Sequence, residues 1–559
     1  MKVDLAAKWA IDNVLKEGLT DVFPEPYEIG LLKNDEFQKI IKNDVVKAVT
    51  GSTLESLKML PIEHVLLPKT SAFDFRRCAL IQPFDTIKYL TLAILLADSI
   101  EKNRPPKARK IVYSYRFALS KGYIFDPKYN FTAFQKHVSE KTKQEKTRIL
   151  VSCDIANFYD RLNLHRLESI LLSIESEKNY VRLVNQLLLS WANRDSYGLP
   201  VGSNASRILA EAALIEVDNY LITIGANFCR FVDDYRFFAP DVHTAHYWLT
   251  QLIDRLWLEG LTINKSKTKI DDVSEITKEK DSDTEAKQNG VDDIKPENRK
   301  KDESRNPFRI VAGYGGTIPT KFRQSSTSEV KKFADIDAES LLGTIKLAKL
   351  ISPEIVNEFL RATLYGKKTT LFVDLPIVLD KFPQFTPLVV DMLIKHKGEI
   401  SVEVKTSIKS YFSKLLSNTE TYLPEYLAIS IIRLLGTDGY DDINILISYF
   451  RSLRRNAGAY IGRAVLEAME SFASRGQVLE IRRYFVRADQ WEKRQIIRIV
   501  DKHLDEDEKR PWLKNVKIQE SNDLFLVETI EPKRKPLKKK KKAKKAPFQP
   551  APLSANKNE

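Results

Sequence analysis

The pattern of apolar residues changes once along this chain of 559 residues. Between about residues 146 and 270, β-branched and aromatic runs alternate with segments of helical spacing, which predicts an α+β domain. From about residue 334 to 518 the spacing is helical throughout, so an all-helical domain is expected there. Single hydrophobic cores rarely exceed about 250–300 residues. The chain is therefore expected to fold as at least two domains.

Three stretches define the expected α+β domain. "TRILVSC" (147–153) has the composition of a buried strand. "NFCRFVDDYRFFAP" (227–240) is typical of two short strands around a two-residue turn. Residues 203–224 predict one long helix, with Ser203 or Asn204 as its cap. The preceding residues 1–145 mix helical spacing with basic and aromatic clusters.

The helical region consists of roughly ten segments separated by short turns, which is close to the spacing of helix-pair repeats. The repeat is degenerate, and an irregular helical bundle is the alternative.

Two charged stretches fit neither domain. Residues 271–306 contain twelve acids, eight bases and no aromatic residue, a composition that predicts a flexible insertion within the α+β domain. Residues 530–559 include ten Lys and Arg between 533 and 545, which supply most of the formal net charge of +14. We expect a disordered basic tail that binds phosphate backbones without sequence preference. A solubility tail is the alternative.

Nothing in the sequence predicts a membrane protein. The longest apolar run, near residues 90–97, is far shorter than a bilayer span. The first eighteen residues carry charges throughout and are typical of an amphipathic helix rather than a signal peptide. Cys78, Cys153 and Cys229 have no metal-type spacing, which indicates free thiols in a reducing compartment. A cytoplasmic protein is expected.

Asp233 and Asp234 lie together in the middle of the expected hairpin. Their repulsion is relieved if a divalent cation binds at an exposed hairpin tip, because such ions prefer carboxylate oxygens. Phosphoryl transfer uses this arrangement, with two Mg²⁺ about 4 Å apart. An ordinary acidic surface turn is the alternative.

Two further features belong with this pair. Asp154 follows a buried strand, where its carboxylate could face the hairpin tip, although a helix cap would also explain it. Gly198, Pro200 and Gly202 form a small-residue loop before a helix. Backbone amides at such a junction can accept phosphate or let a base pair approach, although an ordinary loop would look the same.

In this order and spacing, the three segments resemble the palm of reverse transcriptases. Two more segments extend the resemblance to about residues 60–325. The matching segments are "DIANFYD" (154–160) for the first catalytic motif, "GLPVGSNAS" (198–206) for the template–primer loop and helix, "FVDD" (231–234) for the paired-Asp hairpin, "GLTINKSKTKI" (260–270) for the next motif, and "GYGGTIPTKFR" (313–323) for the primer-gripping hairpin.

The resemblance implies a role for each matching residue. Asp154 and Asp233 would bind two Mg²⁺, for which Mn²⁺ can substitute, with Ile155 in the same metal site and Asp234 as the third acid. Tyr159 would be the aromatic gate that clashes with a 2′-hydroxyl and so favours dNTPs.

Other residues would contact the nucleotide. Lys267 would protonate or neutralise the leaving pyrophosphate, and Pro200 and Gly202 would belong to the nucleotide site. Arg76, Arg77 and Arg116 are candidates for gripping the triphosphate, with structural arginines as the alternative.

The implied fold class is an α+β right-hand polymerase, with fingers over residues 1–145 and a palm over 146–330. An all-helical, HEAT-like domain follows over 334–518. Val201 stands where many retroviral and intron-encoded enzymes have Gln. This residue, the "RILAE" continuation and the long helical domain are more similar to bacterial defence-associated and abortive-infection reverse transcriptases.

That family implies a DNA polymerase acting in antiviral defence, with dNTPs and nucleic acid as partners. Some of its members start synthesis on a protein side chain, others copy a partner non-coding RNA, and the helical domain helps to assemble oligomers. Tyrosines that could serve as a primer are numerous in the helical region, namely Tyr411, Tyr422, Tyr426, Tyr440, Tyr449, Tyr460 and Tyr484. The alternatives are a catalytically silent scaffold that binds nucleic acid through the helical domain and tail, and an RNA-synthesising polymerase, which Tyr159 disfavours.

Overall fold

The computed structural model describes residues 1–19, 26–68, 74–174, 177–192, 195–273, 322, 325–349, 351, 353–418, 423–453 and 459–532. Three predicted features lie largely outside these residues. They are the charged insertion beyond residue 273, the hairpin at 313–323 apart from Phe322, and the basic tail from residue 533 onward.

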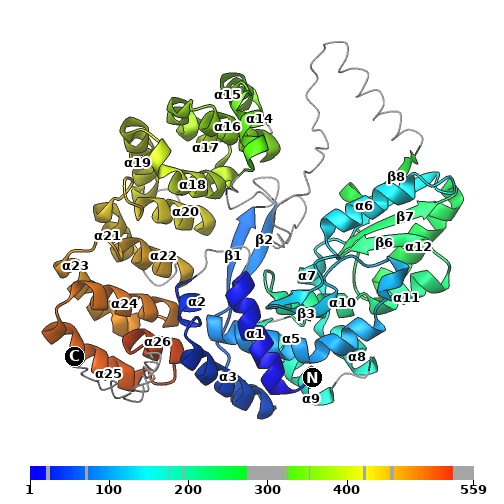
Figure 1. Ribbon diagram of the computed structural model, residues 1–559, viewed down its shortest axis with the longest axis horizontal. Coiled ribbons are helices and arrows are strands. Elements are labelled where there is room, and N and C mark those ends of the chain that lie inside the picture. Colours follow the sequence, from blue (N-terminus) through cyan, green and yellow to red (C-terminus); the bar gives the residue numbers. More distant parts are fainter. Residues whose placement is uncertain are drawn as a thin grey trace, which may run out of the picture.

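A four-stranded antiparallel sheet forms the centre of the α+β part, in the order β6-β7-β5-β8 (Figure 1). Its strands are β5 (Ile149–Asp154), β6 (Phe228–Phe231), β7 (Asp234–Ala239) and β8 (Lys269–Asp272). Along β5, buried and half-buried residues alternate, because successive side chains point to opposite faces. β8 includes residues 271 and 272, so the insertion begins later than the sequence predicted.

Helices cover both faces of this sheet. On one face, Trp248 of α12 (Val242–Leu258) packs against Phe237 of β7, with ring centroids 6.5 Å apart. On the other face, Phe134 of α6 (Phe131–Thr142) packs in a small cluster with Phe238. The catalytic motifs predicted from the sequence therefore lie at the end of a sheet that is fixed from both sides.

The helix predicted over residues 203–224 is wrong in one respect: it is two helices, α10 (Asn204–Ala212) and α11 (Ile215–Thr223). The break lies at Leu214, whose backbone angles (φ −102°, ψ 3°) depart from helical values. Propensity could not reveal it, because Ala and Leu are good helix formers. The other helices of this part are α7 (Phe158–Arg161), α8 (Leu164–Ser173) and α9 (Lys178–Trp191).

The N-terminal part packs helices around α5 (Pro83–Asn103), which begins at a proline, a residue suited to the first helical turn. α5 contacts α1, α3, α9 and α10. Two antiparallel hairpins, β1–β2 and β3–β4, project from this part. Its remaining elements are α1 (Val3–Glu17), α2 (Glu28–Leu31), α3 (Asp35–Thr50), α4 (Leu54–Leu57), β1 (Glu63–Pro68), β2 (Phe75–Leu80), β3 (Phe117–Ser120) and β4 (Tyr123–Phe125).

The described residues from 325 to 532 form helices and short turns, without a strand. Alternate helices pack side by side, α18 on α20, α20 on α22, α22 on α24 and α24 on α26, with α19 against α21 in a second layer. The helices are α14 (Thr327–Ala334), α15 (Ala338–Leu347), α16 (Pro353–Tyr365), α17 (Leu375–Lys381), α18 (Thr386–Lys395), α19 (Val402–Ser417), α20 (Glu425–Leu435), α21 (Ile443–Ser452), α22 (Ala459–Met469), α23 (Arg475–Tyr484), α24 (Gln490–His503), α25 (Glu506–Gln519) and α26 (Leu524–Ile530).

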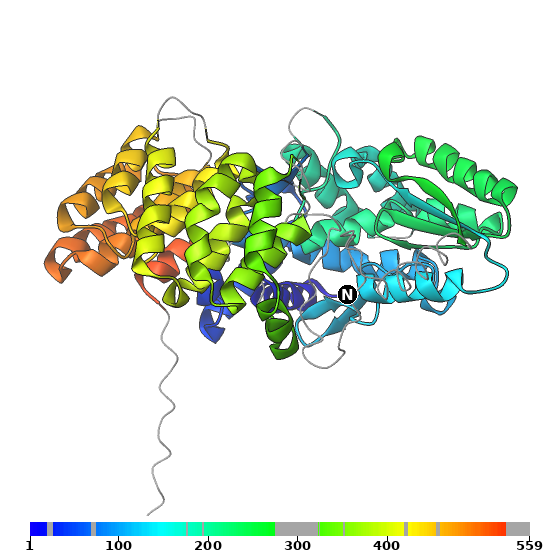
Figure 2. The same ribbon diagram turned by 90° about the horizontal axis from the view of Figure 1, so that it is seen from above.

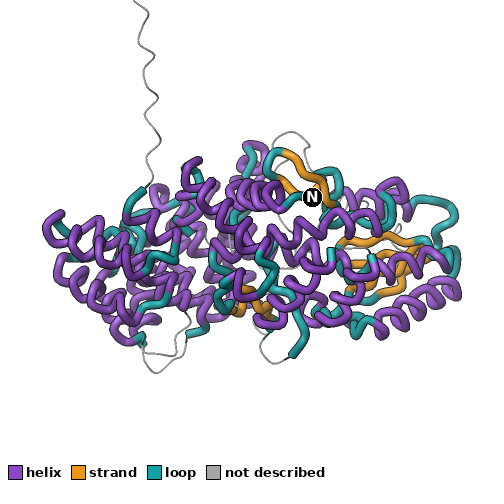
Figure 3. Tube along the Cα trace, turned by 90° about the horizontal axis from the view of Figure 1, so that it is seen from below, coloured by secondary structure: helices purple, strands orange, loops and turns teal. Residues whose placement is uncertain are grey.

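The stacked helices join the N-terminal part through buried charges. Arg463 of α22 pairs with Glu28 at 2.9 Å, and both side chains are fully buried. Arg494 of α24 donates to Gln82 Oε1 at 2.9 Å. The N-terminal helices thereby lie between the stack and the sheet in an elongated molecule (Figure 2). Figure 3 shows helices along its whole length, with the four-stranded sheet near one end. None of the described helices is long and apolar enough to cross a membrane.

Candidate active site

The turn between β6 and β7 presents the first paired acid. It consists of Val232, in the left-handed region at φ 59°, and Asp233, while Asp234 is already the first residue of β7. The sequence had placed both acids at the tip. The backbone carbonyl of Asp233 accepts a hydrogen bond of 3.1 Å from the amide of Ile155. This bond ties the turn to the residue after Asp154.

The strand register brings the three predicted carboxylates together. Asp154, the last residue of β5, lies directly opposite Asp234 in β7. Burial raises the pKa of Asp233 to about 7, and the charges of Asp154 and Asp234 add to the rise. A carboxylate whose charge is disfavoured by burial and by two like charges is a favourable place for a cation.

Two cationic side chains already contact this group of acids. Lys267 Nζ lies 3.3 Å from Asp154 Oδ2, and its side chain is 60% exposed. Arg236 pairs with Asp234, with Nη2 3.1 Å from Oδ2. Burial raises the pKa of Asp234, and Arg236 opposes the rise. Asp234 is thus the acid that an internal guanidinium neutralises.

Asp154 and Asp233 are the residues that fit a divalent ion. Their carboxylates supply the hard oxygen ligands that Mg²⁺ and Mn²⁺ prefer. Ile155 could contribute only a backbone carbonyl, since its side chain is a buried hydrocarbon. Among the described residues, no group of three or more His, Cys, Asp or Glu is arranged to hold a metal ion. Because Asp234 is paired with Arg236, Asp154 and Asp233 are the carboxylates left to hold an ion.

The small-residue loop lies between α7 and β2. The amide of Leu199 donates to the carbonyl of Tyr159 at 2.9 Å, and the amide of Ala79 in β2 donates to the carbonyl of Val201 at 3.1 Å. Gly198 and Gly202 adopt φ of 97° and 109°, which glycine reaches without steric cost. Pro200 lies within this loop, and Tyr159 is 6% exposed. The loop thus connects α7 to the β1–β2 hairpin.

The helix that follows this loop has its first turn occupied by protein. Ser203 caps the amide of Ala205, and the side chain of Asn204 donates at 2.9 Å to Asn13 and to Glu17 of α1. The amide of Ala205 is thus already bound to a protein acceptor, and the side chain of Asn204 is bound to α1.

The three candidate arginines occupy different environments. Arg76 in β2 is half-buried, and its charge lowers the pKa of Asp233. Arg77 is exposed and contacts His64 at 3.2 Å. Consecutive residues of a strand point to opposite faces, so only Arg76 faces the acids. Arg116 is 2% exposed and pairs with Glu101 at 2.7 Å, a position that favours a structural role.

Sequence reasoning missed three residues at this site. Asn264 donates to Asp154 through its side chain at 3.3 Å and through its amide at 2.6 Å. Arg236 lies two residues after Asp234 in β7, so strand alternation could have placed the two on one face. Arg230 donates to the carbonyl of Val232 at 3.0 Å. No local pattern marks this last contact, because it depends on burial.

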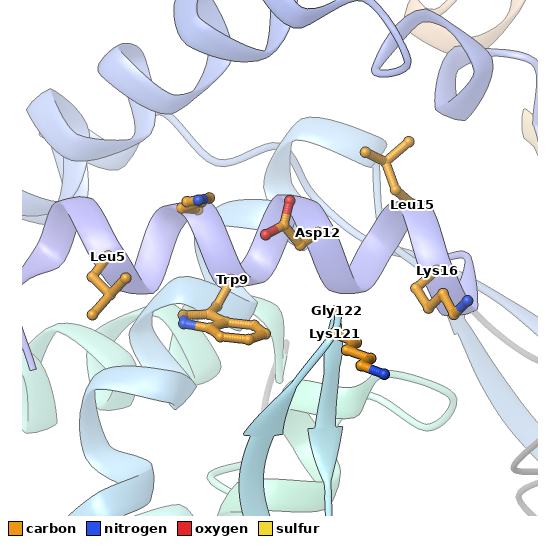
Figure 4. Close-up of a pocket in the computed structure, with 8 residues that line it drawn as sticks. Leu5, Trp9, Asp12, Leu15, Lys16, Lys121 and Gly122 are labelled. Carbon is orange, nitrogen blue, oxygen red and sulfur yellow. The ribbon is translucent and has the colours of Figure 1, made fainter. Parts of the chain in front are cut away.

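A cavity of about 440 Å³ lies between α1 and the β3–β4 hairpin, where Trp9, Asp12 and Lys121 line it (Figure 4). It includes none of the predicted site residues.

Comparison with known proteins supports the resemblance to reverse transcriptases. Residues 109–282 match the family model "Reverse transcriptase (RNA-dependent DNA polymerase)". No curated protein matches the sequence.

Solved structures of telomerase resemble this chain only with low sequence identity and low TM-scores. The telomerase of Candida albicans in complex with a fragment of telomeric RNA is 14% identical, with 76% of this chain and 70% of that chain covered and a TM-score of 0.28. The apo telomerase of Candida tropicalis is 10% identical, with 80% and 73% covered and a TM-score of 0.31. Such TM-scores do not establish a shared overall fold. The family match, which spans Asp154, Asp233, Asp234 and Lys267, shows that the chain contains a reverse transcriptase domain and is an enzyme of the RNA-directed DNA polymerase class.

Proposed function

We propose that this chain adds dNTPs to a growing DNA strand by two-metal phosphoryl transfer. The observation that carries the proposal is the gathering of three acids at the end of β5. Asp154 lies opposite Asp234, and burial together with the charges of Asp154 and Asp234 raises the pKa of Asp233 to about 7. Two divalent ions bound there would neutralise the charge that develops as a 3′-hydroxyl attacks the α-phosphate and pyrophosphate leaves.

The chain's own residues would complete the site. Lys267 is mostly exposed and lies beside Asp154, so its ammonium can reach from the carboxylate to a leaving pyrophosphate. Arg76 would contact the triphosphate, because it extends from β2 toward the same acids. Tyr159, held at its carbonyl by Leu199, would lie beneath the sugar and disfavour a 2′-hydroxyl.

The catalytic assignment is tested by neutralising single acids in the full chain. Asp154→Asn and Asp233→Asn should each lower dNTP incorporation on an RNA template with a DNA primer by at least about 10³-fold. Asp254→Asn, at an exposed position of α12, is the matched control and should leave the rate unchanged. Incorporation by Asp233→Asn within tenfold of the wild-type rate would refute the assignment.

Substrate choice tests Tyr159. Tyr159→Ala removes the ring, so the preference for dNTP over rNTP, measured by kcat/KM for each, should fall by about tenfold or more. An unchanged ratio would assign Tyr159 to packing alone.

We further propose that the enzyme acts in bacterial antiviral defence in the cytosol, with the stacked helices as a HEAT-like assembly domain. The support is the similarity of the palm motifs to defence-associated enzymes and the long helical region packed on the N-terminal part through Glu28 and Arg463. If catalysis is needed, Asp233→Asn will abolish protection of the host against phage. Protection that survives this change would favour the scaffold alternative.

The proposal also includes the question of whether a tyrosine of the chain itself serves as the primer. A tyrosyl primer must reach the acids, whereas Tyr440 is fully buried and Tyr411 donates to Asp380 at 2.7 Å. Tyr422 lies outside the described residues. Incubation of the purified chain with Mg²⁺ and labelled dNTPs tests protein priming. A product that is sensitive to both nuclease and proteinase supports it, and free DNA supports a nucleic-acid primer.

A further inference from the structure

A buried network of alternating charges lies directly behind the catalytic turn. It contains three guanidinium groups and three carboxylates, which link α5, α10, α11, β6 and the segment before β3. The ion pairs run from Arg116 to Glu101 at 2.7 Å, Glu101 to Arg104 at 3.1 Å, Arg104 to Glu211 at 2.8 Å, Glu211 to Arg230 at 2.9 Å and Arg230 to Asp218 at 2.7 Å.

Arg230 is the member of this network that touches the catalytic turn. Its guanidinium is fully buried, pairs with Asp218 and Glu211, and donates through Nη1 to the carbonyl of Val232 at 3.0 Å. The phenol of Tyr235, on the far side of the turn, donates to the same Asp218 at 3.1 Å. Both strands that flank the turn are therefore fastened to one carboxylate.

The backbone of Arg230 is held as well. Its amide donates to the carbonyl of Ile111 at 2.8 Å, and its carbonyl accepts from the amide of Tyr113 at 3.0 Å. The side chain thus extends from a fixed point toward the turn. Because both the backbone and the guanidinium of Arg230 are held in place, this side chain can fix the position of the Val232 carbonyl that it contacts.

Val232 needs such support. Its φ of 59° lies in the left-handed region, which is sterically costly for a β-branched residue. The side chain of Val232 is 5% exposed, so it cannot relax into solvent. Left to itself, this turn would favour another backbone conformation, and Asp233 would move with it.

We propose that Arg230 is a positioning residue that holds the carbonyl of Val232 and so keeps Asp233 facing Asp154. This inference rests on the proposed metal-binding role of those two acids. Asp218 and Glu211 fix the direction of the guanidinium, and Arg230 acts on the reaction only through the turn.

Arg104 offers a matched control. Like Arg230 it is buried and pairs with Glu211, but its donors contact Ser114 and Tyr115 instead of the turn. Arg230→Lys and Arg104→Lys each keep a positive charge and lose the planar fork. Both variants should lower the melting temperature by similar amounts.

The two variants should differ in metal affinity. Mn²⁺ alone is titrated into the full chain without nucleotide, and the free ion is followed by electron paramagnetic resonance. We expect the Kd for Mn²⁺ to rise by about tenfold or more in Arg230→Lys and by less than about threefold in Arg104→Lys. Equal changes in the two variants, or wild-type affinity in Arg230→Lys, would overturn the proposal.

A glycine at the turn provides an independent test. In a Val232→Gly background the left-handed conformation costs little, so Arg230→Lys should then weaken Mn²⁺ binding by less than about threefold. If Arg230→Lys does not fold, Asp218→Asn takes its place in both backgrounds. A loss of affinity that is the same with Val232 and with Gly would contradict the role assigned to Arg230.

A different result would show that the metal site itself is wrongly assigned. If Asp233→Asn bound Mn²⁺ as tightly as the wild type, the proposed function itself would be wrong, and Arg230 would have no ligand to position.

Discussion

Two groups of charged side chains share the hairpin β6–β7, and they differ in how folding treats their charge. In the buried network around Arg230, three carboxylates meet three guanidinium groups. In the group of acids around Asp233, Asp154 pairs with Lys267 and Asp234 pairs with Arg236, while Asp233 has a pKa raised to about 7. Folding neutralises the first group and leaves the second one with an unfavourable charge that a cation can relieve.

This difference in charge balance explains why the two groups lie next to each other. Carboxylates that attract a cation also repel one another, so they stay together only if their backbone is held. Ion pairs buried on packed elements provide that hold, since breaking one leaves an uncompensated buried charge. The neutral network supports the charged site.

The largest expected effect comes from removing a carboxylate of the buried network, and it is an effect on stability. Asp218→Ala leaves the buried guanidinium of Arg230 without its main partner, so the free energy of unfolding should fall by about 3–5 kcal/mol. Denaturant unfolding of the purified chain measures it.

Glu216→Ala is the control, because Glu216 lies on the same helix α11, is 35% exposed and pairs with Arg166 and Arg255. Its loss should cost less than about 1 kcal/mol. Equal losses in the two variants would show that the network is no more important than a surface ion pair.

A smaller effect concerns adjacent arginines of β2. Arg76→Ala should raise the KM for dNTP by about tenfold, because Arg76 faces the acids and would lose a charged contact to phosphate. Arg77→Ala should change it less than about twofold, since Arg77 is exposed beside His64. Steady-state kinetics with a fixed primer–template measure both. A larger effect at Arg77 would reverse the assignment of the two faces.

The smallest effect is a dependence of stability on pH. The pKa of Asp233 is raised from 3.8 to about 7 in the folded chain. Such a carboxyl adds stability below about pH 4, and this contribution is lost as the pH rises through about 7. Asn stays neutral, so metal-free Asp233→Asn should melt about 2 °C above the wild type at pH 8.

The difference should shrink at pH 5, where Asp233 is protonated in the folded state. Thermal unfolding in the presence of a chelator measures both values. A gain that is independent of pH would show that Asp233 carries its charge without penalty.

Most elements around the site follow from local pattern. β5 and the β6–β7 hairpin were predicted because their apolar residues have the period of strands, and the helical region because its residues have the period of helices. The grouping of Asp154 with Asp233 followed from motif order. The cap of α10 at Ser203 was predicted as well. The break at Leu214 and the contacts of Asn204 with α1 could not be predicted, because local propensity contains no sign of either one.

By itself, the sequence determined which side chains the chain offers, namely three acids, Tyr159 and Lys267, in a motif order that resembles that of reverse transcriptases. Only the tertiary structure decided which arginine serves which purpose. Arg76 faces the acids, Arg77 faces away, Arg116 pairs within the interior and Arg230 holds the turn. The physical reason is that a guanidinium acts according to the partners that packing brings to it, and those partners are distant in sequence.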